Sequence, residues 1–415
     1  MHTNERIAVT GMGAVSALGL DLDQSWRGCR EGRSGISIGT FDSGVNGPAP
    51  FCSPIAKLPG DPVKVLESRL TKSLGASLDS FAVFALLAAH EAIADSGLAL
   101  ANNSRKGVVM GVGMGGIGTL ETSYERFFGR KSAKIHPLTI PKVMPSAPAS
   151  AISMAFGIVG PVFSVSSACA SSGHAIIQAA LLIRSGLCDA VICGGSEAIA
   201  SPGSLATWAG LRATSQHTCR PFSSGRDGMV VGEGAAVMVL EREEHATQRG
   251  APVHAWLTGF GMSSDAEHWT QPGLVGATNS IRSACHNAGI LEAESILVSA
   301  HGTGTILNDA NEAAALNAVF GNRLRNHPVI ATKSAHGHLI GATTSLQANL
   351  GIRALSDAIA PPIQNYLGPD PDIDLDLVCG MARPISASHL LVNAFAFGGL
   401  NVSLVFERAE NGVRA

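Results

Sequence analysis

The segment around Cys169 combines a nucleophile with a backbone position that favours its reactivity. Residues 162–165 have the composition of a short strand, and apolar residues with helical spacing run from Ala175 to Ile183. Cys169 therefore falls at a strand-to-helix junction. A helix N-terminus presents unpaired N–H groups and a partial positive charge, which favour a thiolate. Small neighbours in SSACASSG leave room for a substrate.

Two further segments bring histidine to the ends of predicted strands. His301 opens the sequence HGTGT, and His338 lies in KSAHGHLIGA, which begins with Lys333. Thioester chemistry needs a nucleophile that takes the acyl group and imidazole N–H groups that stabilise charge on a carbonyl oxygen. One cysteine and two histidines at three strand ends meet that need.

Other interpretations of these residues are weaker. A lone cysteine or histidine is more often structural, but here three motifs occur together. A zinc site formed by His301, His336 and His338 is disfavoured, because no carboxylate or cysteine lies at ligand spacing. The early GMGAVSALG lacks the G-x-G-x-x-G spacing and the later acidic residue of a dinucleotide site. A close-packed turn between a strand and a helix explains it better.

Short β-branched runs alternate with helical patterns along the chain, which predicts layered sheets covered by helices. One helix is expected from a cap at Ser77 or Asp79 to about Ser96, ended by Gly97. The predicted strands are 6–10, 107–113, 190–193, 235–241, 295–300, 328–332, 390–393 and 401–406.

The strand and helix pattern occurs twice, with a division near residues 250–256. We expect an N-terminal half, residues 1–253, that holds the nucleophilic Cys169. The C-terminal half, residues 254–415, holds His301 and His338. A duplicated α/β fold with one site between its halves fits this arrangement.

Composition narrows the functional class. The 415 residues are 46% hydrophobic and 15% charged, with a net charge of −3, so no overall electrostatic case exists for nucleic-acid binding. A local basic patch for an acidic protein partner stays open. The eight cysteines form no C-x-x-C pair. Without an apolar export signal or a span long enough for a bilayer, the chain is expected to be cytoplasmic.

Four motifs in this order resemble those of the β-ketoacyl-acyl-carrier-protein synthases, the type II elongating condensing enzymes. They are SSACASS around Cys169, HGTGT at 301–305, KSAHGHLIGA at 333–342 and NAFAFGGLN at 393–401. The resemblance covers nearly the whole chain. It implies a duplicated five-layer αβαβα thiolase-like fold, usually dimeric.

The resemblance also implies a role for each residue that matches a motif. Cys169 would accept the acyl chain, and His301 and His338 would bind the malonyl thioester and promote its decarboxylation. Lys333 would orient the histidines. The backbone N–H groups of Cys169 and Phe397 would form an oxyanion hole, and Phe397 would act as a gate. No cofactor and no metal are implied.

The expected partner is an acyl carrier protein, which delivers both the acyl and the malonyl groups. The subunit would form a homodimer, or a heterodimer with a related ketosynthase-like subunit. The family often carries basic residues for carrier docking just before the Asp79 helix, where this chain has Gly75, Ala76 and Ser77. Lys64, Arg69 and Lys72 lie nearby in the sequence and could substitute for them. The expected substrate pocket consists of Thr303, Thr305, Leu120, Lys142, Phe395 and Leu400.

Several positions depart from the family pattern. Ala396 replaces a glycine, Leu400 replaces a threonine, and Gln347 replaces a glutamate that contacts the Lys333 network. Lys142 stands where housekeeping members carry an aromatic pocket residue. These departures favour a specialised pathway, such as those that make nodulation factors or polyenes.

Three related classes of protein fit the sequence less well. A thiolase needs a second catalytic cysteine, and Cys379 lacks the C-x-G context of one. Initiating condensing enzymes use Cys–His–Asn, whereas this chain has His338. A non-catalytic partner that sets chain length in a heterodimer typically loses the nucleophile, which this chain retains.

Overall fold

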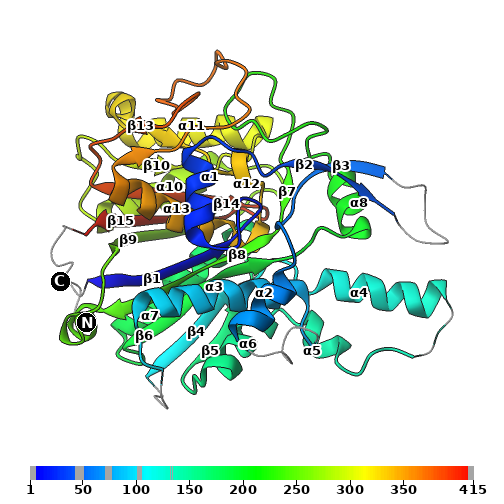
Figure 1. The fold of residues 1–415 in the computed structure, drawn as a ribbon. Helices are drawn as coiled ribbons and strands as arrows, with labels where there is room; N and C mark the ends of the chain where they lie inside the picture. Colours follow the sequence, from blue (N-terminus) through cyan, green and yellow to red (C-terminus); the bar gives the residue numbers. More distant parts are fainter. Residues whose placement is uncertain are drawn as a thin grey trace.

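A computed structural model describes residues 6–42, 51–70, 77–100, 105–130, 132 and 134–409. Within this part of the chain, ten strands form one sheet in the order β11-β10-β14-β15-β9-β1-β8-β6-β4-β5 (Figure 1). The strands are β1 (Ile7–Val15), β4 (Lys106–Gly111), β5 (Val162–Val165), β6 (Ala190–Glu197), β8 (Gly234–Arg242), β9 (Ala255–Ser264), β10 (Leu297–Ser299), β11 (Val329–Ile330), β14 (His389–Ala396) and β15 (Leu400–Arg408).

The two halves of this sheet have the same topology. If the strands of each half are numbered along the chain, both halves have the order 3-2-4-5-1. The halves meet where β1 pairs antiparallel with β9, at Ile7 to Val9 opposite Leu257 to Ala255. The structure therefore contains the duplication that the strand pattern predicts. The boundary at residue 253 stays a prediction, and it falls in the connection between β8 and β9.

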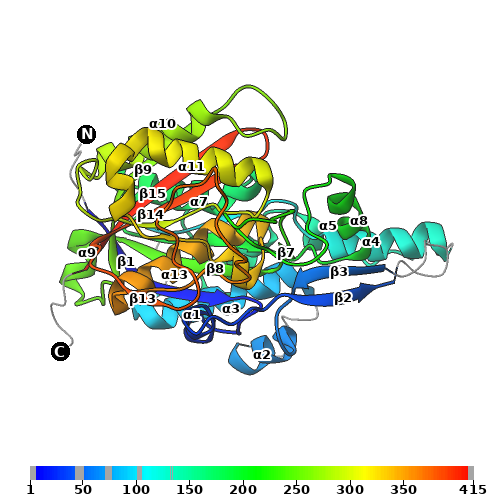
Figure 2. The ribbon, with the colours of Figure 1, turned by 90° about the horizontal axis from the view of Figure 1, so that it is seen from above.

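Helices cover the sheet in layers. Two apolar helices, α7 (Ser171–Arg184) and α13 (Thr343–Asp357), pack against each other between the halves. One outer layer holds α3 (Ser80–Ser96) and α6 (Ala147–Phe156), and the other holds α10 (Leu274–Asn287) and α11 (Ile306–Phe320) (Figures 1 and 2). With the two halves of the sheet as the two β layers, this is the five-layer αβαβα arrangement that the family resemblance implies.

The first strand is longer than predicted. It was expected to cover residues 6–10 but continues to Val15 through a bulge after Val9. The glycines of GMG lie inside the strand because α3 crosses it closely. A Cβ atom at Gly11 would lie 2.1 Å from the carbonyl oxygen of Ala92, and one at Gly13 would lie 2.2 Å from that of Ala88. The close packing of α3 on β1 explains this motif, which is neither a turn nor a dinucleotide-binding loop.

The other predicted elements occur close to their expected positions. Asp79 accepts a hydrogen bond from the Phe81 amide at the start of α3, and Gly97 ends that helix in the left-handed conformation. Strands lie at all eight predicted places. None of the described helices is long and apolar enough to cross a membrane.

Shorter elements project from the layered body. The hairpin of β2 and β3 and the helix α4 extend to one side in both views (Figures 1 and 2). The remaining elements are α1 (Leu22–Arg30), β2 (Ser37–Phe41), β3 (Phe51–Ala56), α2 (Pro62–Arg69), α4 (Ile117–Tyr124), η2 (Glu125–Gly129), α5 (Thr139–Val143), η3 (Ala168–Ala170), α8 (Pro202–Gly210), β7 (Val231–Gly232), α9 (Glu243–Gln248), η4 (Gly321–Asn326), α12 (Lys333–His336), η5 (Ile340–Ala342), β12 (Ile359–Ala360) and β13 (Arg383–Pro384).

Candidate active site

Cys169 lies between strand β5 and the central helix α7, as the sequence predicts. The chain turns sharply here, and Ala168 has a φ of 50°, in the left-handed region. The Ser171 hydroxyl holds the turn, because it accepts from the Ser167 amide at 2.9 Å and donates to the Ala168 carbonyl oxygen at 2.7 Å. Such a turn presents the side chain at the edge of the sheet.

The helix N-terminus was expected to favour the thiolate form of Cys169, and burial acts against that effect. The residue is 4% exposed, and this burial raises the pKa of its thiol to about 11. The charge of Lys333 and the backbone N–H groups of Phe397 and Cys169 act in the opposite direction. Burial outweighs them, so Cys169 is a thiol at neutral pH.

His301 follows strand β10, and hydrogen bonds hold both its backbone N–H group and its carbonyl group. Its N–H group and that of Gly302 donate to the buried carboxylate of Glu312 at 2.7 and 2.8 Å. The ammonium group of Lys333 donates to the His301 carbonyl oxygen and lies 3.3 Å from Nδ1 of the ring. Because an ammonium group has no acceptor, Nδ1 accepts and the proton of a neutral ring is on Nε2.

His338 reaches the same state through different contacts. Its Nδ1 accepts from the Ile340 amide at 3.1 Å and lies 2.9 Å from the Thr343 hydroxyl. The ring proton is therefore on Nε2 here as well. Burial and the charge of Lys333 lower the pKa of both His301 and His338 well below the usual value, so both rings are neutral.

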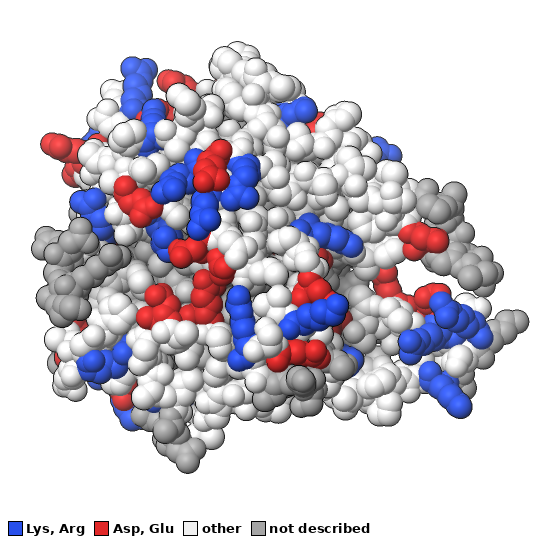
Figure 3. Space-filling view, viewed as in Figure 1, with Lys and Arg blue, Asp and Glu red and all other residues white. Residues whose placement is uncertain are grey.

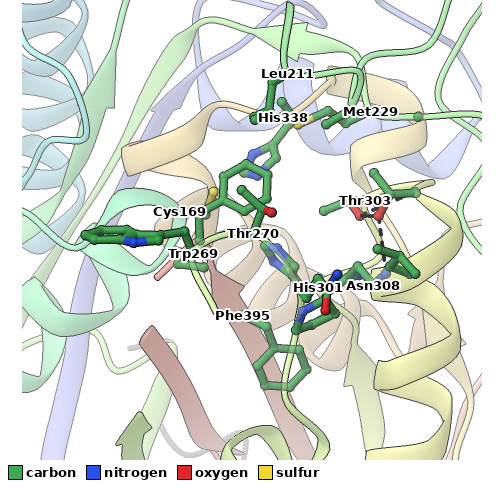
Figure 4. Close-up of a pocket in the computed structure, with 18 of the residues that line it drawn as sticks. Cys169, Leu211, Met229, Trp269, Thr270, His301, Thr303, Asn308, His338 and Phe395 are labelled. Carbon is green, nitrogen blue, oxygen red and sulfur yellow. Dashed lines mark hydrogen bonds between the residues drawn. The ribbon is translucent and has the colours of Figure 1, made fainter. Parts of the chain in front are cut away.

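The two rings and the thiol lie around one cavity of about 320 Å³ (Figure 4). The centroids of the His301 and His338 rings are 5.5 Å apart, with the planes at 84°. Phe395 packs edge-on to His301 at 6.0 Å. Two neutral N–H donors and a sulfur nucleophile around one cavity suit the polarisation of a thioester carbonyl and attack on it.

The hairpin between β14 and β15 closes one side of the cavity. Phe397 is at its tip, followed by Gly398 and Gly399 with φ of 80° and 70°. The Phe397 ring stacks on Trp208 of α8 at 6.3 Å, with the planes 26° apart. The Phe397 amide, together with that of Cys169, faces the sulfur, which is the arrangement an oxyanion hole requires.

The predicted pocket residues divide into two groups. Thr303, Thr305 and Phe395 line the cavity beside Cys169. Leu400 does not line it and packs against the hydrophobic cluster that contains Cys169. Leu120 is part of α4 and does not line this cavity, and Lys142 lines a separate polar cavity between α3, α4 and α5. A role in substrate binding for these three residues stays a prediction.

The residues considered for other kinds of site have other contacts in the described structure. The ring nitrogens of His336 lie 2.8 Å from the Gly337 carbonyl oxygen and 2.9 Å from the Thr332 hydroxyl, so this histidine is held structurally. Cys379 does not line the active-site cavity. Among the described residues, no group of three or more His, Cys, Asp or Glu side chains is placed to hold a metal ion.

Family models cover most of the chain. Residues 4–246 match the model described as β-ketoacyl synthase, N-terminal domain, and residues 254–367 match β-ketoacyl synthase, C-terminal domain. The chain belongs to the β-ketoacyl synthase family. It is a condensing acyltransferase with the thiolase-like fold of that family.

Relatives of this synthase match over their full length. Nodulation protein E of Rhizobium meliloti (strain 1021) is 39% identical over 98% of this chain and 100% of its own. 3-Oxoacyl-acyl-carrier-protein synthase 2 of Staphylococcus aureus (strain N315) is 33% identical over 99% of this chain and 100% of its own.

Solved structures agree with this assignment. The ishigamide ketosynthase/chain length factor superimposes with a TM-score of 0.90 at 29% identity, covering 98% of this chain and 100% of that one. A β-ketoacyl synthase from Burkholderia phymatum STM815 superimposes with a TM-score of 0.87 at 32% identity, with the same coverage.

The synthase accommodates its departures from the family pattern locally. Ala396 is the last residue of β14, paired with Leu400, and its φ is not positive, so a side chain fits there. Gln347 keeps a contact with Lys333, since its Oε1 accepts from the ammonium group at 2.8 Å.

Several residues of the site have no recognisable signal in the sequence. Trp208 stacks on Phe397, and the Thr343 hydroxyl lies 2.9 Å from Nδ1 of His338. Asp265 anchors the hairpin, because it accepts from Asn401 Nδ2 at 2.7 Å while its amide donates to the Gly399 carbonyl oxygen at 2.9 Å. Each acts through one tertiary contact, which no local motif encodes.

Proposed function

We propose that this synthase extends a Cys169-bound acyl chain by decarboxylative Claisen condensation with a malonyl thioester. The observation that carries the proposal is the convergence of the Cys169 thiol, two neutral histidine N–H donors and the Phe397 amide on one cavity. His301 and His338 serve the malonyl group, and the amides of Cys169 and Phe397 serve the acyl group.

The first half-reaction loads the enzyme. The Cys169 sulfur attacks the acyl thioester carbonyl, and the backbone N–H groups of Cys169 and Phe397 stabilise the charge on its oxygen. A C–S bond forms to Cys169, the C–S bond to the carrier breaks, and the carrier thiol leaves with the proton that Cys169 loses. Burial raises the pKa of Cys169 to about 11, so the proton has to be removed during this half-reaction.

The second half-reaction makes the carbon–carbon bond. Nε2–H groups of His301 and His338 donate to the malonyl thioester oxygen, so the bond to the carboxylate breaks, CO₂ leaves and an enolate forms. The enolate carbon attacks the acyl-Cys169 carbonyl. The C–S bond then breaks, the β-ketoacyl product departs, and the Cys169 thiolate takes up a proton. These bond changes balance without a cofactor.

The carrier of both substrates is inferred to be an acyl carrier protein. The name of the Staphylococcus aureus relative includes acyl-carrier-protein, and one structural neighbour, at 27% identity, is a type II ketosynthase in complex with its carrier. Lys64 and Arg69 are exposed residues of α2, while Lys72 lies outside the described residues. Figure 3 shows further basic side chains over the projecting α4 region.

A second subunit is part of the proposal. Strand β5 is at the edge of the sheet, half-buried along its whole length and paired only with β4 among the described strands. Two neighbours are ketosynthases with a chain length factor. The subunit is therefore inferred to dimerise, with itself or with a related silent chain. We place the enzyme in the cytoplasm and, from its nodulation-protein relatives, in a specialised acyl pathway.

A silent chain-length-determining subunit is the second candidate function. It is disfavoured by the complete set of Cys169, His301, His338 and Lys333 around one cavity. Intact-protein mass spectrometry after incubation with a panel of acyl-carrier thioesters separates the two. An acyl adduct that disappears on adding malonyl carrier supports the condensing enzyme. If no donor gives an adduct, the result supports the function of a silent chain-length-determining subunit.

A further inference from the structure

Gln347 is a buried amide with contacts to two elements of the active site. Its Oε1 accepts from the Lys333 ammonium group at 2.8 Å, and its Nε2 donates to the Ala300 carbonyl oxygen at 2.5 Å. The Ser299 hydroxyl lies 3.4 Å from Nε2. Ala300 immediately precedes His301, so one side chain links Lys333 to the backbone beside His301.

We propose that Gln347 is a positioning residue that sets the upper pH limit of condensation, by holding the Lys333 cation against His301 without a contacting carboxylate. The inference rests on the proposed function and adds to it a residue that acts through Lys333.

The contacts of the Lys333 ammonium group among the described residues are all neutral. They are the His301 carbonyl oxygen, Nδ1 of the same ring and Oε1 of Gln347. The side chain is fully buried, so water does not stabilise its charge. Burial lowers the pKa of Lys333 to about 8, even though carboxylates farther away raise it. The titratable groups that face Lys333 are Glu312 and Asp309 of α11, Cys169 of η3, Cys219, His301, His336 and His338.

The carboxylates are already engaged elsewhere. Glu312 accepts from the His301 and Gly302 amides and from Asn393. Asp309 accepts from the amides of Phe222, Thr303 and Gly304. Neither is in contact with the ammonium group. Gln347 therefore occupies the position where a direct counter-charge would fit.

The charge of Lys333 controls which nitrogen of His301 carries the proton. While Lys333 is an ammonium, Nδ1 of His301 must accept, and Nε2–H is available for the malonyl thioester. A neutral Lys333 amine has a lone pair and can accept from Nδ1–H, which leaves Nε2 bare. Condensation should therefore fall as the pH rises through the Lys333 pKa. Acylation does not use the Nε2–H group of His301, so the rate of acylation should not fall over the same pH range.

The test is the variant Gln347→Glu, with each half-reaction measured separately from pH 6 to pH 10. A carboxylate at this position stabilises the ammonium form and moves the alkaline fall of condensation to higher pH by about 1–3 pH units. The pH profile of acylation should keep its shape. The control is Gln248→Glu, which adds the same charge at an exposed position on α9 and should match the parent in both profiles.

If the alkaline fall of condensation occurs at the same pH in Gln347→Glu as in the parent, while acylation still occurs, the proposal is overturned. Loss of acylation in the parent enzyme would instead overturn the proposed function. The new carboxylate would also face the Ala300 carbonyl oxygen, to which Gln347 donates. A second measurement that does not need activity therefore accompanies the pH profiles.

 Unfolding by urea supplies that measurement. An ion pair with Lys333 acts only while the lysine is protonated, so the stability that Gln347→Glu gains relative to the parent should fall between pH 7 and pH 10. A difference in stability that is constant with pH would contradict the proposal even if the variant were inactive.

Discussion

The backbone nitrogen of Ile340 lies 3.1 Å from Nδ1 of His338 and donates to it. This contact fixes the ring as an Nε2–H donor without any charged partner. His301 obtains the same tautomer from the ammonium group of Lys333, which lies 3.3 Å from its Nδ1. The two histidines are therefore equivalent as donors but differ in what holds them, one by an amide and the other by a charge.

Replacement of the nucleophile should abolish acyl transfer. We expect Cys169→Ala to form no covalent adduct with an acyl-carrier thioester, because no other cysteine of the described chain lines the cavity. Mass spectrometry of the intact protein measures the adduct, with Cys52→Ala, an exposed position, as the control. Stoichiometric labelling of Cys169→Ala would remove Cys169 from its role.

His338→Ala should separate the two half-reactions. The ring donates to the malonyl thioester and not to the acyl group, so acylation should persist while condensation falls by about 10²–10³-fold, as on removal of one oxyanion donor. Single-turnover assays with pre-acylated enzyme measure the second step. Full retention of condensation would exclude His338 from the mechanism.

The gate can be tested at Ala396. A glycine there restores backbone freedom at the start of the hairpin that carries Phe397. If Phe397 acts as a gate between the two steps, Ala396→Gly should change the rate of condensation more than the rate of acylation. Rapid-quench measurement of each step provides the comparison. Equal effects on both steps would argue against an altered gate.

Acylation should become faster as the pH rises. The folded-state pKa of Cys169 is about 11, above the usual value of 9.0, so the thiolate fraction increases about tenfold per pH unit below that value. We expect the rate of adduct formation to rise from pH 6 to pH 9 without a plateau, under conditions where chemistry is limiting. A plateau near pH 7 would mean that the thiolate already forms in the free enzyme.

Packing of α3 on β1 makes a prediction about stability. The carbonyl oxygen of Ala88 leaves no room for a side chain at Gly13, so Gly13→Ala should lower the free energy of unfolding by about 1–3 kcal/mol. At Gly118 of α4 an added Cβ meets nothing within 4 Å, so Gly118→Ala serves as the control and should be neutral or stabilising. Urea unfolding measures both. Equal stability of the two variants would contradict the packing argument.

Much of this fold could be predicted from the sequence because its signals are local. Asp79 and Gly97 cap α3 as expected, and the strand ends that carry Cys169, His301 and His338 are where β-branched runs give way to small residues. The GMG segment shows the limit of such signals. Its glycines suggested a turn, whereas they serve the close approach of a helix more than seventy residues away in the chain.

The candidate site was also predictable where its signals are local in the sequence. Motifs locate the reacting groups, but the ionisation of Cys169 depends on how deeply the folded protein buries it, which outweighs the helix terminus. Trp208 and Asp265 could not be found, since each matters only through a partner distant in sequence. Leu120 and Lys142 were placed by analogy with family positions, and the cavity of this single chain does not include them.

The burial of Cys169 also has a consequence for the lifetime of the enzyme. Peroxide and electrophiles attack the thiolate form of exposed cysteines, and each oxidation beyond the sulfenic acid is irreversible for most proteins. Cys169 is 4% exposed and stays protonated at neutral pH, so the resting enzyme offers such reagents little to attack. The nucleophile is in this way protected against chemical damage between one turnover and the next.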